Sequence, residues 1–216
     1  MAGTKVKTSV ANLKYVFITG EGKDQAMKGE EPRMQFVASL VCPKDGETHK
    51  HFQAQLDVEW NNYKKAHSVK GLPKTNGIKD EMQKDPDGAI DPTTEEIKRV
   101  PTGNVVIGFK TNTCWPNGNP QVVKVKDRKG KDITSAINSV DWSIGEGSTG
   151  IIHGMAVGNN VGGTHKVTLY LSAVQIAKLV KYEGNDVDAD EIEGEDIDLG
   201  DEVEAIGDTE ANTPNL

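Results

Sequence analysis

The fold is decided by the stretch GIIHGMAVGNNVGGTHKVTLYLSAVQI, residues 150–176. In its second half Val167, Leu169 and Leu171 alternate with Thr168 and Tyr170, which is the period of a strand with one buried face. Residues 150–157 and 165–176 are therefore expected to form a β-hairpin across the glycine-containing segment 159–163. In this arrangement Tyr170 faces away from the core.

Two more strands are expected near the N-terminus. Residues 13–19 are aromatic and β-branched and lead into the turn residues Gly20 and Gly22. Residues 33–42 alternate, which predicts one core face and one solvent face. The core face holds Met34, Phe36, Ala38, Leu40 and Cys42, and the solvent face holds Arg33, Gln35 and Ser39.

After Pro43 the period changes to that of a helix. Phe52, Leu56, Tyr63 and Trp60 predict one amphipathic helix over residues 48–67, with Asp45 and Thr48 available as caps. Three histidines in or beside this segment lack a metal-ligand spacing, so we assign them no chemistry: His49, His51 and His67.

The segment 71–99 contains three prolines and a TTEE capping signature at residues 93–96. It is expected to be a long loop with at most a turn or two of helix. The clustered carboxylates of the first 182 residues fall here, in residues 80–96.

Strands resume at residues 103–113 and 121–126, and Asn117 with Gly118 predicts a hairpin turn between them. Residues 131–142 form a short connection, and the GEGSTG run at 145–150 precedes a β segment rather than the helix that a dinucleotide site needs. Five or six strands and one helix predict a mainly β, OB-fold-like antiparallel barrel.

The cysteines and the lengths of the apolar runs restrict which classes of protein the sequence can encode. Cys42 and Cys114 sit in apolar surroundings without a CxxC partner, so both are expected to be reduced and buried in strands. No apolar run reaches the length of a membrane helix, and no signal peptide is recognised, so we expect a cytoplasmic protein without membrane contact. We expect no cofactor, no metal and no catalytic residue.

Charge is distributed unevenly along the chain. Residues 183–216 hold fourteen of the 33 acidic residues and none of the 25 basic ones, which leaves about +6 on residues 1–182 and −14 on the tail. The tail has no aromatic residue and is expected to be disordered beside a binding domain at 1–182. Its start resembles a calcium loop, but Glu191 and Ile197 replace the required Gly and Glu.

A basic domain with exposed aromatics suits single-stranded DNA, because lysines bind the backbone and aromatic rings stack on bases. Trp115, Tyr170 and Tyr15 are the stacking candidates, and packing over a barrel end is the alternative for each. The expected DNA contacts are Lys110, Trp115, Lys124, Lys126, Arg128, Lys129, Lys131, Lys166, Tyr170, Arg33 and Tyr15. The tethered tail is expected to compete with DNA for the basic surface and, once released, to bind partners.

With these residues in view, the chain resembles the replication single-stranded DNA-binding proteins of bacteriophages, especially of podoviruses. The likeness is carried by VKDRKGKDI at 125–133, the strand around 148–150, KVTLYL at 166–171 and VQIAKLVKYEG at 174–184, leading into the acidic tail. The N-terminal strand pair ending in Val41, Cys42, Pro43 and Lys44 also fits.

This resemblance implies an OB fold that coats single-stranded DNA in phage replication and recombination, in the cytoplasm of an infected bacterium. It implies that the tail contacts the phage DNA polymerase and helicase-primase, and a homodimer is a further possibility. The chain ends on Leu216, where well-known members end on an aromatic residue. The tail residues expected to bind partners are Asp186, Asp188, Asp190, Glu191, Glu193, Glu195, Asp196, Asp198, Asp201, Glu202, Glu204 and Leu216.

Two alternatives remain open at this point. One is a metal-dependent nucleic-acid enzyme that uses the carboxylates of residues 80–96. The other is an interaction protein whose acidic tail mimics DNA and captures basic partners.

Overall fold

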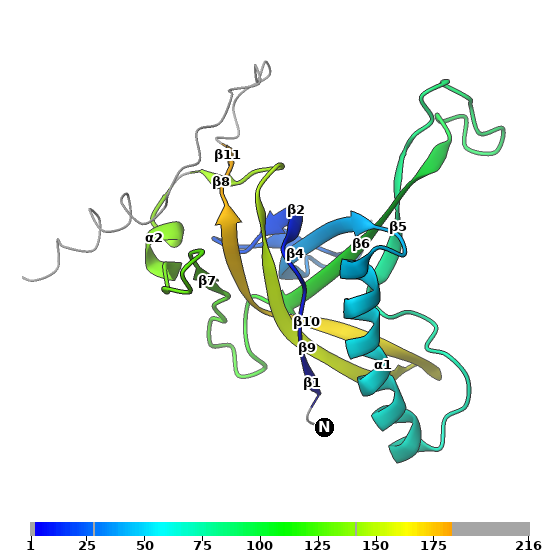
Figure 1. The fold of residues 1–216 in the computed structure, drawn as a ribbon, viewed down its shortest axis with the longest axis horizontal. Coiled ribbons are helices and arrows are strands. Elements are labelled where there is room, and N and C mark those ends of the chain that lie inside the picture. Colours follow the sequence, from blue (N-terminus) through cyan, green and yellow to red (C-terminus); the bar gives the residue numbers. More distant parts are fainter. Residues whose placement is uncertain (1–2, 28, 141, 183–216) are drawn as a thin grey trace, which may run out of the picture.

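The computed structural model describes residues 3–27, 29–140 and 142–182, and the predicted tail, its disorder and its partner contacts lie outside these residues. Five strands form a closed barrel in which each strand pairs with the next and the last returns to the first (Figure 1). In barrel order they are β2 (Ala11–Phe17), β4 (Met34–Pro43), β6 (Arg99–Asn112), β10 (Thr164–Lys178) and β9 (Thr149–Val161). The expected OB-like barrel is confirmed, although β6 and β10 pair in parallel where an antiparallel barrel was predicted.

Smaller elements surround the barrel. The helices are α1 (Glu47–His67) and the short α2 (Thr134–Asn138). The strands outside the ring are β1 (Thr4–Lys7), β3 (Lys23–Asp24), β5 (Ile78–Lys84), β7 (Lys124–Lys126), β8 (Ser143–Ile144) and β11 (Lys181–Tyr182).

The hairpin predicted from residues 150–176 is the longest pairing of the barrel. β9 and β10 pair antiparallel from Thr164↔Val161 to Lys178↔Thr149, around a two-residue Gly162–Gly163 turn. Gly158 of β9 lies directly under Tyr63 of α1, and a Cβ there would collide with the tyrosine ring. A glycine at this position therefore lets the helix pack closely on the strand.

The predicted helix is confirmed as α1, and its apolar stripe of Phe52, Leu56, Trp60 and Tyr63 is buried. The expected caps are wrong, because Gly46 is the N-cap residue and no side chain caps the helix. Asp45 instead occupies the left-handed region at φ +62°, and its N–H donates to His49 Nδ1 at 3.0 Å.

α1 also holds the first strand in place. Gln55 accepts from the Lys7 N–H at 3.0 Å and donates to the Lys7 carbonyl at 2.9 Å. The buried Glu59 carboxylate accepts from Thr4 N at 3.1 Å and from Gly158 N at 2.9 Å. Gln55 thus satisfies Lys7 of β1, while Glu59 bridges the ends of the paired strands β1 and β9.

The predicted hairpin of residues 103–113 and 121–126 is wrong. The turn at Asn117–Gly118 exists, since Gly118 N donates to the Trp115 carbonyl at 2.8 Å, but the pairing stops after one bridge between Cys114 and Pro120. Pro116 and Pro120 lack the N–H that a ladder needs. β7 instead pairs parallel with β10 at Ala173, Val174 and Gln175.

The segment 71–99 is also more ordered than predicted. β5 pairs antiparallel with β6 from Ile78↔Ile107 to Lys84↔Arg99, and this two-stranded ribbon projects from the barrel (Figure 1). Residues 93–96 form turns instead of the expected helical start. β5 has only two apolar residues, Ile78 and Met82, and the charged Asp80 lies between them on the same face, so its sequence lacks the alternation by which strands are recognised.

Burial confirms most of the predicted core and corrects part of it. Phe36, Phe52, Phe109 and Cys42 are buried as expected. Cys114 is exposed, contrary to expectation, because it lies in the loop beyond β6. Gln35 and Ser39 were expected on a solvent face, yet both are buried. Gln35 pairs with Lys23 of β3 and donates to Asn112 Oδ1 at 2.7 Å, and Ser39 lies in the wall of a cleft.

Candidate nucleic-acid interface

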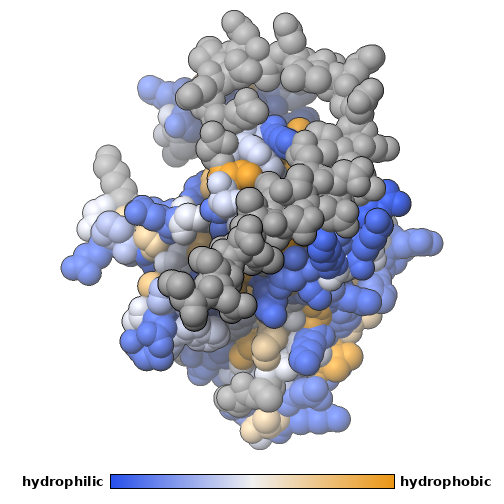
Figure 2. Space-filling view, turned by 90° about the vertical axis from the view of Figure 1, so that its left-hand side faces the viewer, coloured by the Kyte–Doolittle hydropathy of each residue, from blue (hydrophilic) through white to orange (hydrophobic). Residues whose placement is uncertain are grey.

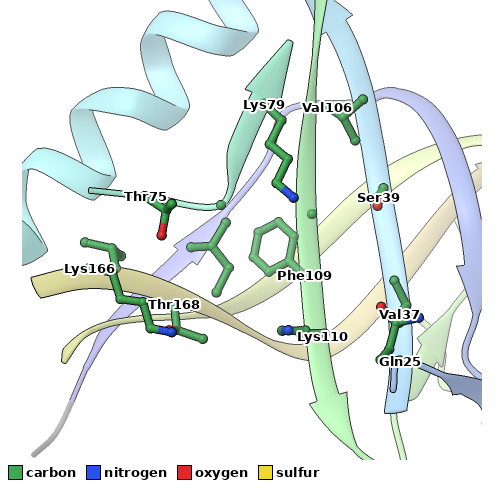
Figure 3. A pocket seen from close by; sticks show the side chains of 14 residues that line it. Gln25, Val37, Ser39, Thr75, Lys79, Val106, Phe109, Lys110, Lys166 and Thr168 are labelled. Atoms are coloured by element: carbon green, nitrogen blue, oxygen red, sulfur yellow. The ribbon is translucent and has the colours of Figure 1, made fainter. Parts of the chain in front are cut away.

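A cleft of about 400 Å³ opens on the outer side of β4, β6 and β10. Figure 3 shows Lys79, Lys110 and Lys166 converging on it from three different elements. We call it the lysine cleft, and the lining residues used below are Gln25, Val37, Ser39, Thr75, Gly77, Lys79, Gly108, Lys110, Lys166 and Thr168.

Alternation in β6 creates the floor of this cleft. Val105, Ile107 and Phe109 point into the core, so Gly108 and Lys110 point outward. Gly108 has no side chain, and its N–H donates to the Gly77 carbonyl at 3.0 Å. The segment before β5 thereby lies against β6.

The same segment is fixed to β10. Val167 N donates to the Thr75 carbonyl at 2.9 Å, and Lys74 N donates to the His165 carbonyl at 3.0 Å. These bonds hold Lys79 of β5 and Lys166 of β10 on one side of the cleft, near Lys110 of β6 (Figure 3). The opposite side carries Gln25, whose carbonyl accepts from the Arg33 guanidinium at 2.7 Å.

Positive charge accumulates in the lysine cleft. Partial burial lowers the pKa of Lys110, and the nearby charges of Arg33, Lys166 and Lys79 lower it further. Among the described residues, no carboxylate lies within ion-pair distance of Lys79, Lys110 or Lys166. An arrangement of this kind favours an anionic ligand that neutralises several amines at once.

Carboxylates of β5 are engaged elsewhere. Asp80 pairs with Lys44 at 2.8 Å, and Glu81 pairs with Lys14 at 3.1 Å. Hydrogen bonds from Asn104 and Thr102, followed by Lys14, lower the pKa of Glu81. These acids therefore do not offset the cleft lysines.

Strand register places an exposed aromatic ring beside Lys110. Tyr170 is the β10 partner of Lys110 and is 43% exposed, which confirms that it faces away from the core. Continuing the pairings around the barrel gives one row of outward-facing positions that spans about 24 Å at the usual strand spacing. This outer row consists of Lys5, Met155, Tyr170, Lys110, Val37 and Phe17.

The structure brings four of the predicted contact residues together, namely Lys110, Lys166, Tyr170 and Arg33. A second group lies further along β10, on β7 and the turn after it. This β7 basic turn consists of Lys124, Lys126, Arg128, Lys129 and Lys131. Gln175 of β10 donates to the Arg128 carbonyl at 3.3 Å, which ties the turn to the barrel.

The β7 basic turn differs electrostatically from the cleft. Bonds from Thr134, followed by the charges of Lys124 and Lys126, lower the pKa of Asp132, so these two lysines have an acidic neighbour. Figure 2 shows the α2 side of the molecule, where most of the visible surface is hydrophilic and the hydrophobic patches are small and separated.

The two remaining aromatic candidates do not line the cleft. Trp115 is 53% exposed in the loop after β6. Tyr15 is 55% exposed on β2, beyond the end of the cleft. About half of each residue is covered, so both stacking on DNA and partial burial remain open for these two side chains.

Sequence reasoning missed Lys79 and Gln25 as cleft residues. Lys79 lies in the segment that was expected to be a loop, and Gln25 follows the very short β3. Phe17 was assigned to a strand without a role, and it is 38% exposed at the end of the outer row. The sequence feature that could have identified Phe17 is its position two residues after Tyr15, on the same face of the strand.

The described part of the chain offers no support for the metal-enzyme alternative. It contains no group of three or more His, Cys, Asp or Glu residues placed to hold a metal ion. Likewise, none of its helices is long and apolar enough to cross a membrane.

No protein-family model matches the sequence, and no curated protein matches it. Solved structures do match. The crystal structure of gp2.5, a single-stranded DNA-binding protein encoded by bacteriophage T7, has a TM-score of 0.57 at 15% identity, covering 88% of this chain and 100% of the T7 chain.

The single-stranded DNA-binding protein of bacteriophage Enc34 matches in two forms. Its C-terminal truncation gives a TM-score of 0.54 at 19% identity, covering 83% of this chain and 88% of that one. Its complex with single-stranded DNA gives 0.53 at 19% identity, with coverages of 84% and 90%. The resemblance seen in the sequence is thus confirmed for the fold, and this chain has the fold of the phage single-stranded DNA-binding proteins.

Proposed function

We propose that the protein binds single-stranded DNA without sequence preference and has no enzymatic role. The observation that carries this proposal is the lysine cleft. Lys79, Lys110 and Lys166 crowd together there, without an acidic partner among residues 3–27, 29–140 and 142–182, beside the exposed ring of Tyr170. Amines that follow a backbone and a ring that stacks on a base are the two components of such binding.

The fold supports the same proposal. A barrel with this architecture occurs in the Enc34 protein, which has been solved in complex with single-stranded DNA. The cleft here is open and its polar groups are amines, hydroxyls and an amide, so it distinguishes bases poorly. The β7 basic turn and Trp115 extend the binding surface along the strand.

We further propose that the protein coats DNA during phage replication and recombination inside the host cytoplasm. The acidic tail, residues 183–216, competes with DNA for the basic surface and recruits the phage DNA polymerase and helicase-primase when DNA displaces it. Fourteen carboxylates on a tether compete at a millimolar effective concentration. Homodimer formation through the tail is part of this proposal.

A titration tests both parts. Full-length protein and a form ending at Tyr182 are titrated with fluorescent oligo-dT at several salt concentrations, and duplex DNA of the same length is the control. We expect both forms to bind, the shorter one more tightly, with affinity falling steeply as salt increases. If neither form binds at low salt, the DNA-binding proposal is wrong. If both bind equally well, only the role of the tail is wrong.

A further inference from the structure

β2 contains a bulge at an aromatic residue. The pairing of β2 with β4 shifts between Lys14 and Phe17, and Tyr15 lies in the left-handed region at φ +54°. A residue with a side chain adopts this conformation only where its surroundings impose it, and bulges commonly redirect a side chain. Here Tyr15 is 55% exposed, and Phe17 is 38% exposed two residues later.

A lysine lies over both rings. The Lys23 amine is 4.6 Å from the centre of the Phe17 ring and 6.0 Å from that of Tyr15. Lys14 lies 5.5 Å from the Tyr15 ring, but it pairs with Glu81 and Glu146. Lys23 forms no ion pair within the described ranges.

This corner is continuous with the lysine cleft. Phe17 is the last residue of the outer row and pairs with Val37 of β4. Val37 in turn pairs with Lys110 of β6. Three strand spacings separate Phe17 from Tyr170, about 14 Å. A strand of DNA that stacks on Tyr170 and contacts Lys110 therefore reaches Phe17 after crossing Val37.

We propose that Tyr15, Phe17 and Lys23 form a second nucleotide-binding subsite, the β2 platform. Bases of the single strand that leaves the lysine cleft stack on the two rings, and Lys23 binds a phosphate between them. This inference rests on the proposed function and adds the direction in which the strand crosses the barrel.

Oligonucleotide length separates the platform from the cleft. Full-length protein is titrated with oligo-dT of about 4 and about 16 nucleotides, the range that one OB fold covers. The test variants are Phe17→Ala, Tyr15→Gly and Lys23→Gln. Tyr182→Ala is the matched control, because Tyr182 is an exposed aromatic residue outside the outer row.

We expect Phe17→Ala and Tyr15→Gly each to weaken binding of the long oligonucleotide about tenfold, which corresponds to one base stack. Binding of the short one stays unchanged, since it is held in the cleft. Lys23→Gln lowers the salt dependence for the long oligonucleotide by about 0.7 in log–log slope, as for one phosphate. Glycine suits the left-handed conformation at position 15, so Tyr15→Gly leaves the melting temperature unchanged or higher.

Two results would overturn the platform. In the first, the Phe17 and Tyr15 variants bind the long oligonucleotide normally, while Tyr170→Ala weakens both lengths; the cleft then stands alone. In the second, they weaken both lengths equally. If Lys110→Met and Tyr170→Ala also bind both lengths normally, the lysine cleft is not the binding site. Failure of the proposed function itself is distinguishable, because the parent protein then binds neither length at low salt.

Discussion

Replacing Lys110 with methionine tests the lysine cleft most directly, because methionine keeps the apolar stem and removes the charge. A hydrogen bond between an amine and a phosphate contributes about 1.5–3 kcal/mol, so its loss weakens DNA binding about 10- to 100-fold. Relief of repulsion acts in the same direction. The free protein loses the unfavourable proximity of Lys110 to Arg33, Lys166 and Lys79, which DNA otherwise neutralises on binding.

Fluorescence anisotropy with labelled oligo-dT between about 50 and about 200 mM salt measures both the affinity and its salt slope. We expect the slope to fall by about 0.7, the value for one phosphate on a single strand. Lys65→Met is the control, since Lys65 is exposed on α1 and does not line the cleft. Equal effects of the two substitutions would refute the cleft argument, because net charge alone would then explain the loss.

Replacing Lys110 with methionine should also change the folding stability of the DNA-free protein. Burial and neighbouring cations hold the pKa of Lys110 below 10.5, so the charged amine destabilises the folded state at neutral pH. Stability in the parent protein therefore rises as pH increases from the lowered pKa towards 10.5. We expect Lys110→Met to raise the melting temperature at neutral pH and to remove this alkaline rise.

Three further predictions concern other parts of the molecule. Gly158→Ala forces a Cβ against Tyr63, which cannot swing away because it stacks on Trp60 and bonds His165 at 3.0 Å; urea denaturation should show a loss of about 1–3 kcal/mol with an unchanged m-value. The lowered pKa of Glu81 means that its contribution to stability is complete above about 4.5 and is lost as pH falls through the folded-state pKa. Glu81→Gln should flatten the acid side of the pH–stability curve, and an identical curve would contradict the network. Trp115→Phe should remove most of the emission change on DNA binding, because Trp60 is buried and Trp142 lies under Lys181.

Local periodicity in the sequence was sufficient to predict those helices and strands that have one apolar face. The β9–β10 hairpin and α1 follow directly from it, since Val167, Leu169 and Leu171 or Phe52, Leu56 and Tyr63 repeat at the period of their element. It failed for β5, where the charged Asp80 interrupts the apolar face between Ile78 and Met82, and for β7, whose partner β10 lies far along the chain. A pairing between distant strands leaves no local pattern.

Residues of the candidate site were predicted correctly only where the strands that carry them were recognised. Lys110, Tyr170 and Lys166 follow from outward positions on strands that were correctly recognised. Lys79 depends on β5, and the relation of Lys110 to Lys124 depends on β10 lying between their strands. The wrong hairpin placed these two lysines on paired strands, whereas the barrel separates them.

Closure of the barrel has a consequence for how the chain folds during synthesis. β1 pairs with β9 at Thr4↔Ala156, and β2 pairs with β9 at Ala11↔Gly150, so the first strands wait for partners made near the end. At about 5–20 residues per second, this leaves their edges open for roughly 7 to 30 seconds. α1 is made soon after β1, and Gln55 bonds the edge of β1 that β9 does not use. Once the helix has formed, β1 has one open edge instead of two while β9 is still to be made, which reduces the risk of aggregation.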